Sequence, residues 1–75
     1  MITLVELKNG KYGIIREIDG GHGIKKRLEV MNIREGKKII KKCSAPLRGP
    51  VVIEIDGCKM AIGRGMAKKV WVEEI

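Results

Sequence analysis

The clearest alternation of apolar and polar positions lies in the second half of the chain. Apolar side chains at every other position from Val51 to Ile55 are typical of a half-buried strand. Asp56-Gly57, which follows, is a preferred pair for a two-residue type I′ turn. That turn sets Ile55 opposite Cys58, and it sets Glu54 opposite Lys59 as a pair of opposite charges on the outer face. The predicted core face of this hairpin contains Val51, Ile53, Ile55, Cys58, Met60 and Ile62. We therefore expect the Cys58 thiol to be buried as a small hydrophobic group.

The segment after the first long strand has a different period. Ile24, Leu28 and Met31 are spaced i, i+4 and i+7, which places them on one face of a helix. Asn32 stands where a residue must adopt the left-handed conformation, and a Schellman ending would bring Ile33 onto Leu28. The position before the helix lacks Ser, Thr, Asp or Asn, so the sequence marks the end of this helix more clearly than its start.

The remaining segments are short and separated by turns. Further strands are predicted at GKYGIIREI, KKIIKKC and VWVEEI, and the last of these points Val70 and Val72 inward. GRGMAKK is predicted as a turn, with room for one short helical turn. About five strands with one inserted helix indicate a mainly β fold, a small and partly open barrel. We expect a single domain over residues 1–75.

Length and hydropathy favour a module that binds a partner. A chain of 75 residues buries only about 60–65% of its unfolded surface, which suits recognition better than a deep catalytic cleft. Uninterrupted apolar runs reach three residues, far below the roughly 20 that a membrane-spanning helix needs. The N-terminus carries no charged-then-apolar leader pattern. We expect a soluble, cytoplasmic protein.

The net charge of +7 permits two interpretations. Clustered lysines attract phosphate or an acidic partner surface, or they simply form a solvated face. Grooves for single-stranded nucleic acid combine basic residues with stacked aromatic rings. Tyr12 and Trp71 are the only residues among Phe, Tyr and Trp in the sequence, which argues against such a groove.

Candidate chemical groups are sparse. Cys43, Cys58 and His22 lack the spacing of a zinc site, and the two cysteines allow at most one disulfide. The histidine has no nucleophile placed beside it, and Glu54 and Asp56 lie on the solvent face of a predicted strand. We expect no tight metal site, no cofactor and no enzymatic activity.

The loop between two of the predicted strands is stiffened by proline. Pro46 and Pro50 fix φ and restrict the residues before them, so the loop loses little entropy on docking. Leu47 lies between them without a strand partner, and Arg48 can bond a carboxylate with two parallel hydrogen bonds. Leu47 could instead fold back onto the open end of the barrel. Our hypothesis is that these four residues, Pro46, Leu47, Arg48 and Pro50, contact a partner.

Three blocks of the sequence resemble FeoA-like domains. RLEVMNIREG is similar to their Arg-Leu then Gly-apolar-x-Pro-Gly segment, and APLRGPVVIEIDG to their Ala-Pro-x-Gly-x-Pro loop and following strand. MAIGRGMAKKVWV resembles their closing apolar-Ala-Leu-Arg and Ala-x-x-Ile-x-Val pattern. The order and spacing of the blocks also fit. Asn32, Glu35 and Gly63 depart from the usual glycine, proline and arginine.

The resemblance implies an SH3-like barrel and a role in ferrous iron uptake. The expected partner is FeoB, a membrane transporter with a GTP-binding cytosolic domain, so the protein would be peripheral to the membrane through that partner. The same module forms the C-terminal domain of iron- and manganese-dependent repressors, for whose other domains this chain has no room. An alternative is a small basic SH3-like RNA-binding protein, and the oligomeric state stays open, with a homo-oligomer possible.

Overall fold

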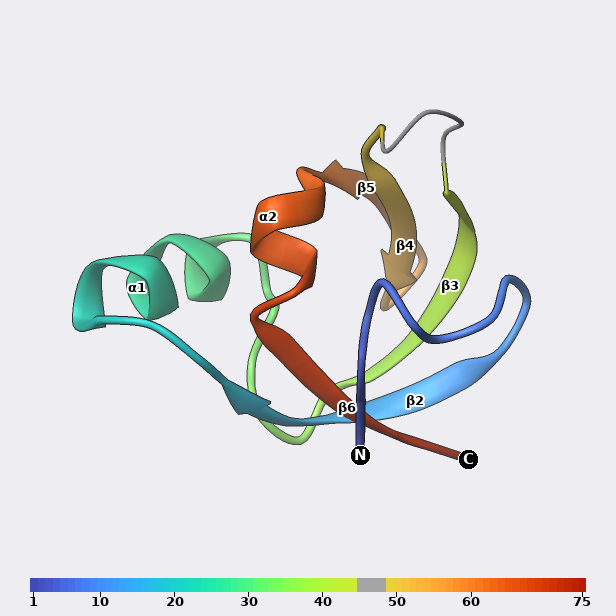
Figure 1. Cartoon of the computed structure of the whole chain (residues 1–75), viewed down its shortest axis with the longest axis horizontal. Helices are drawn as coiled ribbons and strands as arrows, with labels where there is room; N and C mark the ends of the chain where they lie inside the picture. The colour runs from blue at the N-terminus through green and yellow to red at the C-terminus, as the bar shows by residue number, and fades with distance from the viewer. Residues whose placement is uncertain (45–48) are drawn as a thin grey trace.

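The computed structural model describes residues 1–44 and 49–75. Within these ranges the chain forms six strands and two short helices (Figure 1). The strands are β1 (Ile2–Thr3), β2 (Tyr12–Ile18), β3 (Lys38–Ser44), β4 (Val51–Ile55), β5 (Cys58–Ile62) and β6 (Val70–Glu74). The helices are α1 (His22–Val30) and α2 (Arg64–Ala67). These are the only two helices in the described residues, and neither is long and apolar enough to cross a membrane.

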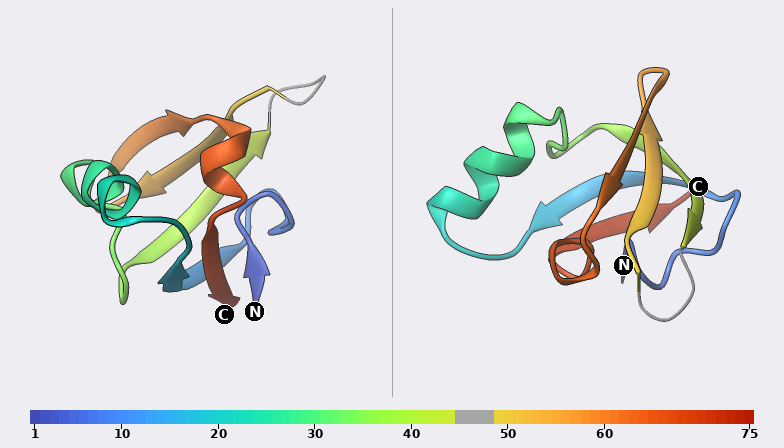
Figure 2. Two further views of the ribbon diagram at one scale, coloured as in Figure 1. Left: turned by 60° about the vertical axis from the view of Figure 1, so that its left-hand side comes forward. Right: turned by 90° about the horizontal axis from the view of Figure 1, so that it is seen from above.

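One antiparallel sheet organises the molecule, with the strand order β1-β6-β2-β3-β4-β5. Figure 2 shows that the sheet curves strongly without closing, so that β1 and β5 form its two edges. The mainly β, partly open architecture predicted from the sequence is confirmed. The sequence pattern missed β1, because the chain turns directly after its two residues: the Leu7 N–H donates to the Thr3 carbonyl at 3.0 Å.

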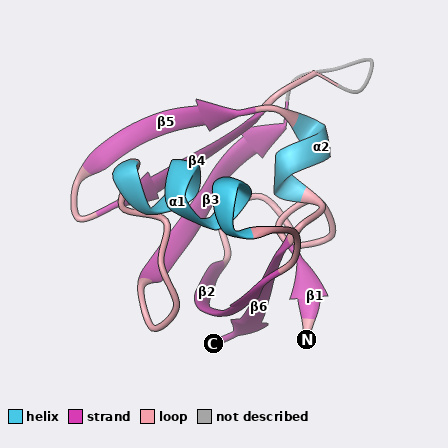
Figure 3. Cartoon of the chain, turned by 90° about the vertical axis from the view of Figure 1, so that its left-hand side faces the viewer, coloured by secondary structure: helices cyan, strands magenta, loops and turns pink. Residues whose placement is uncertain are grey.

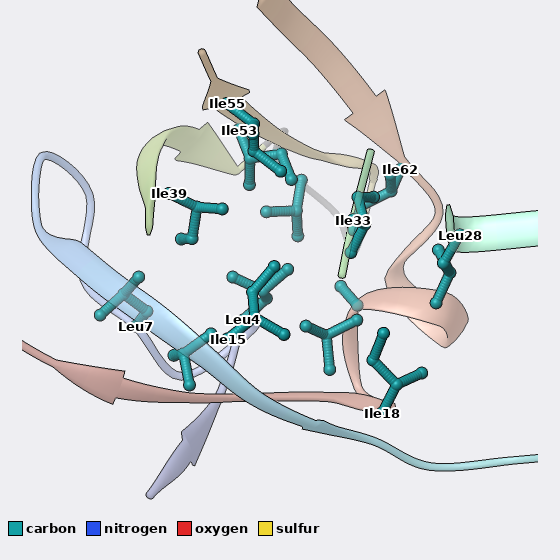
Figure 4. Close-up of a cluster of buried hydrophobic side chains, with 14 residues drawn as sticks. Leu4, Leu7, Ile15, Ile18, Leu28, Ile33, Ile39, Ile53, Ile55 and Ile62 are labelled. Carbon is teal, nitrogen blue, oxygen red and sulfur yellow. The ribbon is translucent and has the colours of Figure 1, made fainter. Parts of the chain in front are cut away.

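The core lies inside the curve of the sheet (Figure 4). Strand residues that point inward alternate with outward ones, as the period of two requires. Val70 and Val72 point inward as predicted, and both are fully buried. The buried cluster consists of Leu4, Leu7, Ile15, Ile18, Leu28, Ile33, Ile39, Val51, Ile53, Ile55, Ile62, Ala67, Val70 and Val72.

The predicted β4–β5 hairpin is confirmed in turn type and register. Asp56 has φ 51° and Gly57 has φ 81°, and positive values at both positions define a type I′ turn. Ile55 pairs with Cys58, and Glu54 pairs with Lys59. The ion pair that Glu54 forms is with Lys42 on β3, at 3.8 Å.

The prediction that Cys58 is buried is wrong, because its thiol is exposed. Cys58 lies on the expected face opposite Ile55, but it begins β5, which is an edge strand. Ile55 is covered by neighbours on both sides, whereas the first residue of an edge strand has a neighbour on one side. Along this face of β5, Met60 is only half-buried and burial is complete at Ile62.

Helix α1 ends as its sequence predicts. Asn32 adopts φ 66°, its N–H donates to the Glu29 carbonyl at 2.9 Å, and the Ile33 N–H donates to the Leu28 carbonyl at 2.9 Å. These two bonds form a Schellman motif and bring buried Ile33 next to buried Leu28. Gly21 precedes the helix, and no side-chain hydrogen bond caps this end. The helix stands at the side of the sheet (Figures 1 and 3), and Leu28 is its one buried residue.

Candidate partner-binding site

The loop predicted to bind a partner is described only in part. Pro46, Leu47 and Arg48 lie outside the described residues. Pro50 is exposed and directly precedes β4. Because Val51 pairs with Ile62, the chain enters β4 at the same end of the hairpin where it leaves β5 for α2.

At that end the structure contains an apolar groove that the sequence analysis did not find. It lies where α1, the end of β5 and α2 meet, and its volume is about 200 Å³. The groove is lined by Arg27, Leu28, Met31, Ala61, Ile62, Gly63 and Met66. A cavity of about 150 Å³ can hold a benzene ring, so this groove has room for one large apolar side chain.

The floor and the rim of the groove differ in burial. Leu28 and Ile62 form a floor that belongs to the core. Met31 directly follows α1 as its C-cap and is 37% exposed, although its spacing had placed it on the apolar face with Ile24 and Leu28. Methionine is flexible and polarisable, which suits a surface that adapts to a partner. The groove therefore joins a rigid floor to an adaptable apolar rim.

Arg27 supplies a positive charge beside this apolar surface. It is exposed and lies in the last turn of α1. A guanidinium at the rim favours a partner segment that carries a carboxylate next to its apolar side chain. A partner segment that fits the groove therefore needs both a large apolar side chain and a negative charge beside it.

A polar cluster fixes α1 against the hairpin and so holds one wall of the groove. The Asp56 carboxylate accepts a hydrogen bond from the Asn32 amide at 2.9 Å and one from the Lys37 ammonium at 2.8 Å. These bonds connect the end of α1, the segment before β3 and the β4–β5 turn. The Lys37 and Asn32 hydrogen bonds, with the charge of Lys37, lower the pKa of Asp56 below its usual 3.8.

A second hollow, of about 300 Å³, lies at another face of α1. Ile18, Lys25, Glu29, Arg34 and Glu35 line it. Its two cationic and two anionic side chains balance, so it has little electrostatic preference for a charged partner. The apolar groove is the better candidate for a specific contact.

The structure does not bring the candidate metal ligands together. Cys43 pairs with Val52 near the start of β4, whereas Cys58 faces Ile55 at its end. Both thiols are free and exposed, and His22 begins α1. No cluster of three or more His, Cys, Asp or Glu side chains able to hold a metal occurs in residues 1–44 and 49–75.

The two aromatic residues do not form a stacking surface. Tyr12 is 45% exposed, and the Lys38 ammonium lies 4.8 Å from the centre of its ring. Trp71 is only half-exposed, and its indole N–H donates to the Asp19 carboxylate at 2.7 Å. One exposed ring offers little platform for successive bases.

The curved sheet with helices at its side is a small SH3-like β domain, and the comparisons assign its family. Residues 2–74 match the FeoA domain family, and the chain belongs to that family. The "Putative Fe(2+) transport protein A" of Methanocaldococcus jannaschii is 40% identical over 74 residues, which cover 99% of this chain and 88% of that protein.

Solved structures agree with this assignment. A crystal structure of "Iron Uptake Regulatory Protein (FeoA)" has a TM-score of 0.90 and 34% identity, with 99% of this chain and 96% of that chain covered. The zinc complex of Stenotrophomonas maltophilia FeoA, described as a procaryotic SH3 domain protein, has a TM-score of 0.81 at 21% identity, covering 97% and 91%. ScaR with bound Cd²⁺ contains the same fold in 35% of its chain, with all of this chain covered, a TM-score of 0.90 and 23% identity.

Proposed function

We propose that this protein is a non-enzymatic accessory protein of ferrous iron uptake that binds the cytosolic side of a FeoB-type transporter. Membership of the FeoA domain family and the 40% identical relative named for Fe(2+) transport support the iron-uptake role. A cytoplasmic location follows from this role.

The observation that carries the binding proposal is the groove between α1, β5 and α2. Its apolar lining includes Met31, a large side chain that is 37% exposed. Burying such surface against a partner is favourable, at about 25 cal/mol for each Å² removed from water. The transporter segment that it would accept carries one large apolar side chain and, next to Arg27, an acidic residue.

The proline-stiffened loop remains a second proposed contact. Pro50 is exposed at the same end of the hairpin as Gly63 of the groove. Pro46, Leu47 and Arg48 lie outside the described residues, and we retain them as part of this proposed contact on the basis of their sequence.

Capture from membranes tests the proposed function. A tagged form of this chain, incubated with detergent-solubilised membranes of its own source organism, should retain the FeoB-type transporter with and without RNase. Retention of RNA, with all bound protein lost after RNase treatment, would instead support the RNA-binding alternative. Failure to retain the transporter under both conditions would contradict our proposal.

A further inference from the structure

One face of α1 points away from the rest of the molecule. Leu28 is the one buried residue of this helix, and Lys26 and Val30 each lie two positions from it. Two positions along an α-helix correspond to a rotation of about 200°, so both side chains point away from the core. Because they are four positions apart, they lie one above the other on the same face. Figure 3, seen from the side of α1, shows the helix in front of the sheet, so the sheet does not cover this outer face.

The outer face carries an apolar side chain that the fold does not bury. Val30 is 82% exposed, more than Met1 and Ile75 at the two ends of the chain. Valine is also a weaker helix former than alanine or glutamine, because its branched side chain loses rotamer freedom in a helix. Neither packing nor helix propensity therefore explains valine at this position. Met31, which is 37% exposed, follows it and continues the apolar surface towards the rim of the groove.

Cationic side chains flank Val30 on α1. Lys26 lies four positions before it and Arg27 three positions before it, and both are exposed. Neither cation takes part in an ion pair within residues 1–44 and 49–75. Glu29, the acidic residue of the helix, turns to another side and lines the charged hollow there. The outer face therefore combines two positive charges with an exposed apolar group.

We propose that this outer face of α1, formed by Lys26, Arg27 and Val30, binds the surface of an anionic lipid bilayer. Phosphate headgroups match the two cations, and the boundary between headgroups and acyl chains accepts the valine side chain. A nucleic acid would match the cations alone, so the exposed valine favours lipid. The contact is shallow and reversible, as for a helix that lies on a membrane. It needs a bilayer, so it plays no part in binding to a transporter in neutral detergent.

Co-sedimentation with protein-free vesicles tests this surface independently of the proposed function. The chain should bind vesicles of phosphatidylglycerol and phosphatidylcholine, bind pure phosphatidylcholine vesicles much less, and dissociate as salt screens the charges. Lys26→Gln should weaken binding by about fivefold, the contribution of one cation near an anionic surface. Val30→Gln should weaken it by about threefold or more through the lost apolar contact. Arg27 is left unchanged because it also lines the groove.

Two matched controls lie on the far side of the molecule from α1. Figures 1 and 2 place there the segment between β1 and β2, which contains exposed Lys8, and the C-terminus, which ends at exposed Ile75. Lys8→Gln removes the same charge as Lys26→Gln, and Ile75→Gln removes an exposed apolar side chain. Neither control should change binding to the vesicles.

Three results would overturn the site. Equal weakening by Lys8→Gln and Lys26→Gln would mean that net charge alone attracts the bilayer. Equal binding to charged and neutral vesicles would remove the electrostatic basis, and unchanged binding in Val30→Gln would remove the apolar one. If the chain instead binds a single-stranded oligonucleotide through Lys26 and leaves the vesicles in solution, the face belongs to a nucleic acid. Both altered side chains are exposed, so the variants should fold, which circular dichroism checks.

Discussion

At the scale of single residues, Asp56 serves two purposes, one through its backbone and one through its side chain. Its backbone, at φ 51°, supports the type I′ turn that sets the hairpin register. Its carboxylate accepts hydrogen bonds from Asn32 and Lys37 and so fixes the end of α1. The turn was evident in the sequence from the Asp-Gly pair. The hydrogen bonds of the carboxylate were not evident, because they involve residues 24 and 19 positions away.

Asp56→Asn separates these two roles. Asparagine tolerates the left-handed conformation and also favours this turn, so the variant loses the charge and keeps the turn. Because the folded-state pKa lies below 3.8, the carboxylate stabilises the fold above that pH, and this contribution disappears as the pH falls through the folded-state pKa. We expect Asp56→Asn to have a lower free energy of unfolding in urea at about pH 7, and we expect this difference to shrink as the pH falls below 3.8 and to vanish below the folded-state pKa.

A double-mutant cycle with Lys37→Met controls this measurement. If the charge of Asp56 acts through Lys37, Asp56→Asn should cost less in the Lys37→Met background than in the original chain. An equal cost in both backgrounds, or a loss at about pH 7 that persists undiminished near pH 3, would refute the electrostatic explanation.

At the scale of elements, the sequence predicted best those features of the helices and strands that neighbouring residues in the chain determine. Asp56-Gly57 fixed the pairing of β4 with β5, and Asn32 marked the Schellman end of α1. The position of a strand in the sheet is different, because it depends on contacts between distant segments. The exposure of Cys58 follows from β5 being an edge strand, which its alternation does not reveal.

The groove was missed for the same reason. Met31 and Met66 are 35 positions apart, and their elements meet only because β5 leads into α2 beside the end of α1. The available signal was a methionine at the end of one short helical segment and another within the second, which fits a core position equally well. The sequence therefore predicted the kind of protein better than the surface that it uses.

The edge position of β5 makes a direct prediction for Cys58. In the folded protein, both Cys58 and Cys43 should react with a thiol reagent as fast as a thiol in an unfolded peptide. Cys58→Ser should change the free energy of unfolding by no more than about 0.5 kcal/mol, as is usual for surface substitutions. Slow labelling of Cys58, or a loss of about 1–3 kcal/mol in the serine variant, would indicate a buried thiol after all.

At the scale of the whole molecule, the fold places a rigid core beneath adaptable surfaces. Floor residues of the groove, Leu28 and Ile62, are part of the same core as the strands. The rim residue Met31 lies outside it. Substitutions at the surface should therefore separate partner binding from stability.

The loop gives one such test. Leu47→Ala combined with Arg48→Ala should weaken binding to the transporter while leaving the melting temperature nearly unchanged. A melting temperature lower by several degrees would mean that Leu47 packs against the barrel, since about 1 kcal/mol shifts the melting temperature of a domain this small by roughly 4–8 °C. If neither quantity changes, the loop is not part of the interface.

The most direct test of the account compares two adjacent residues at the end of α1. Met31 lines the groove, whereas Val30 is 82% exposed and lies outside it. The measurement is the dissociation constant of the complex with the detergent-solubilised transporter, for Met31→Gln and for Val30→Gln. We predict that Met31→Gln weakens binding by about tenfold or more, as at a hot spot, and that Val30→Gln leaves it unchanged. Unchanged binding in both variants, or equal weakening in both, would contradict the claim that the groove is the partner-binding site.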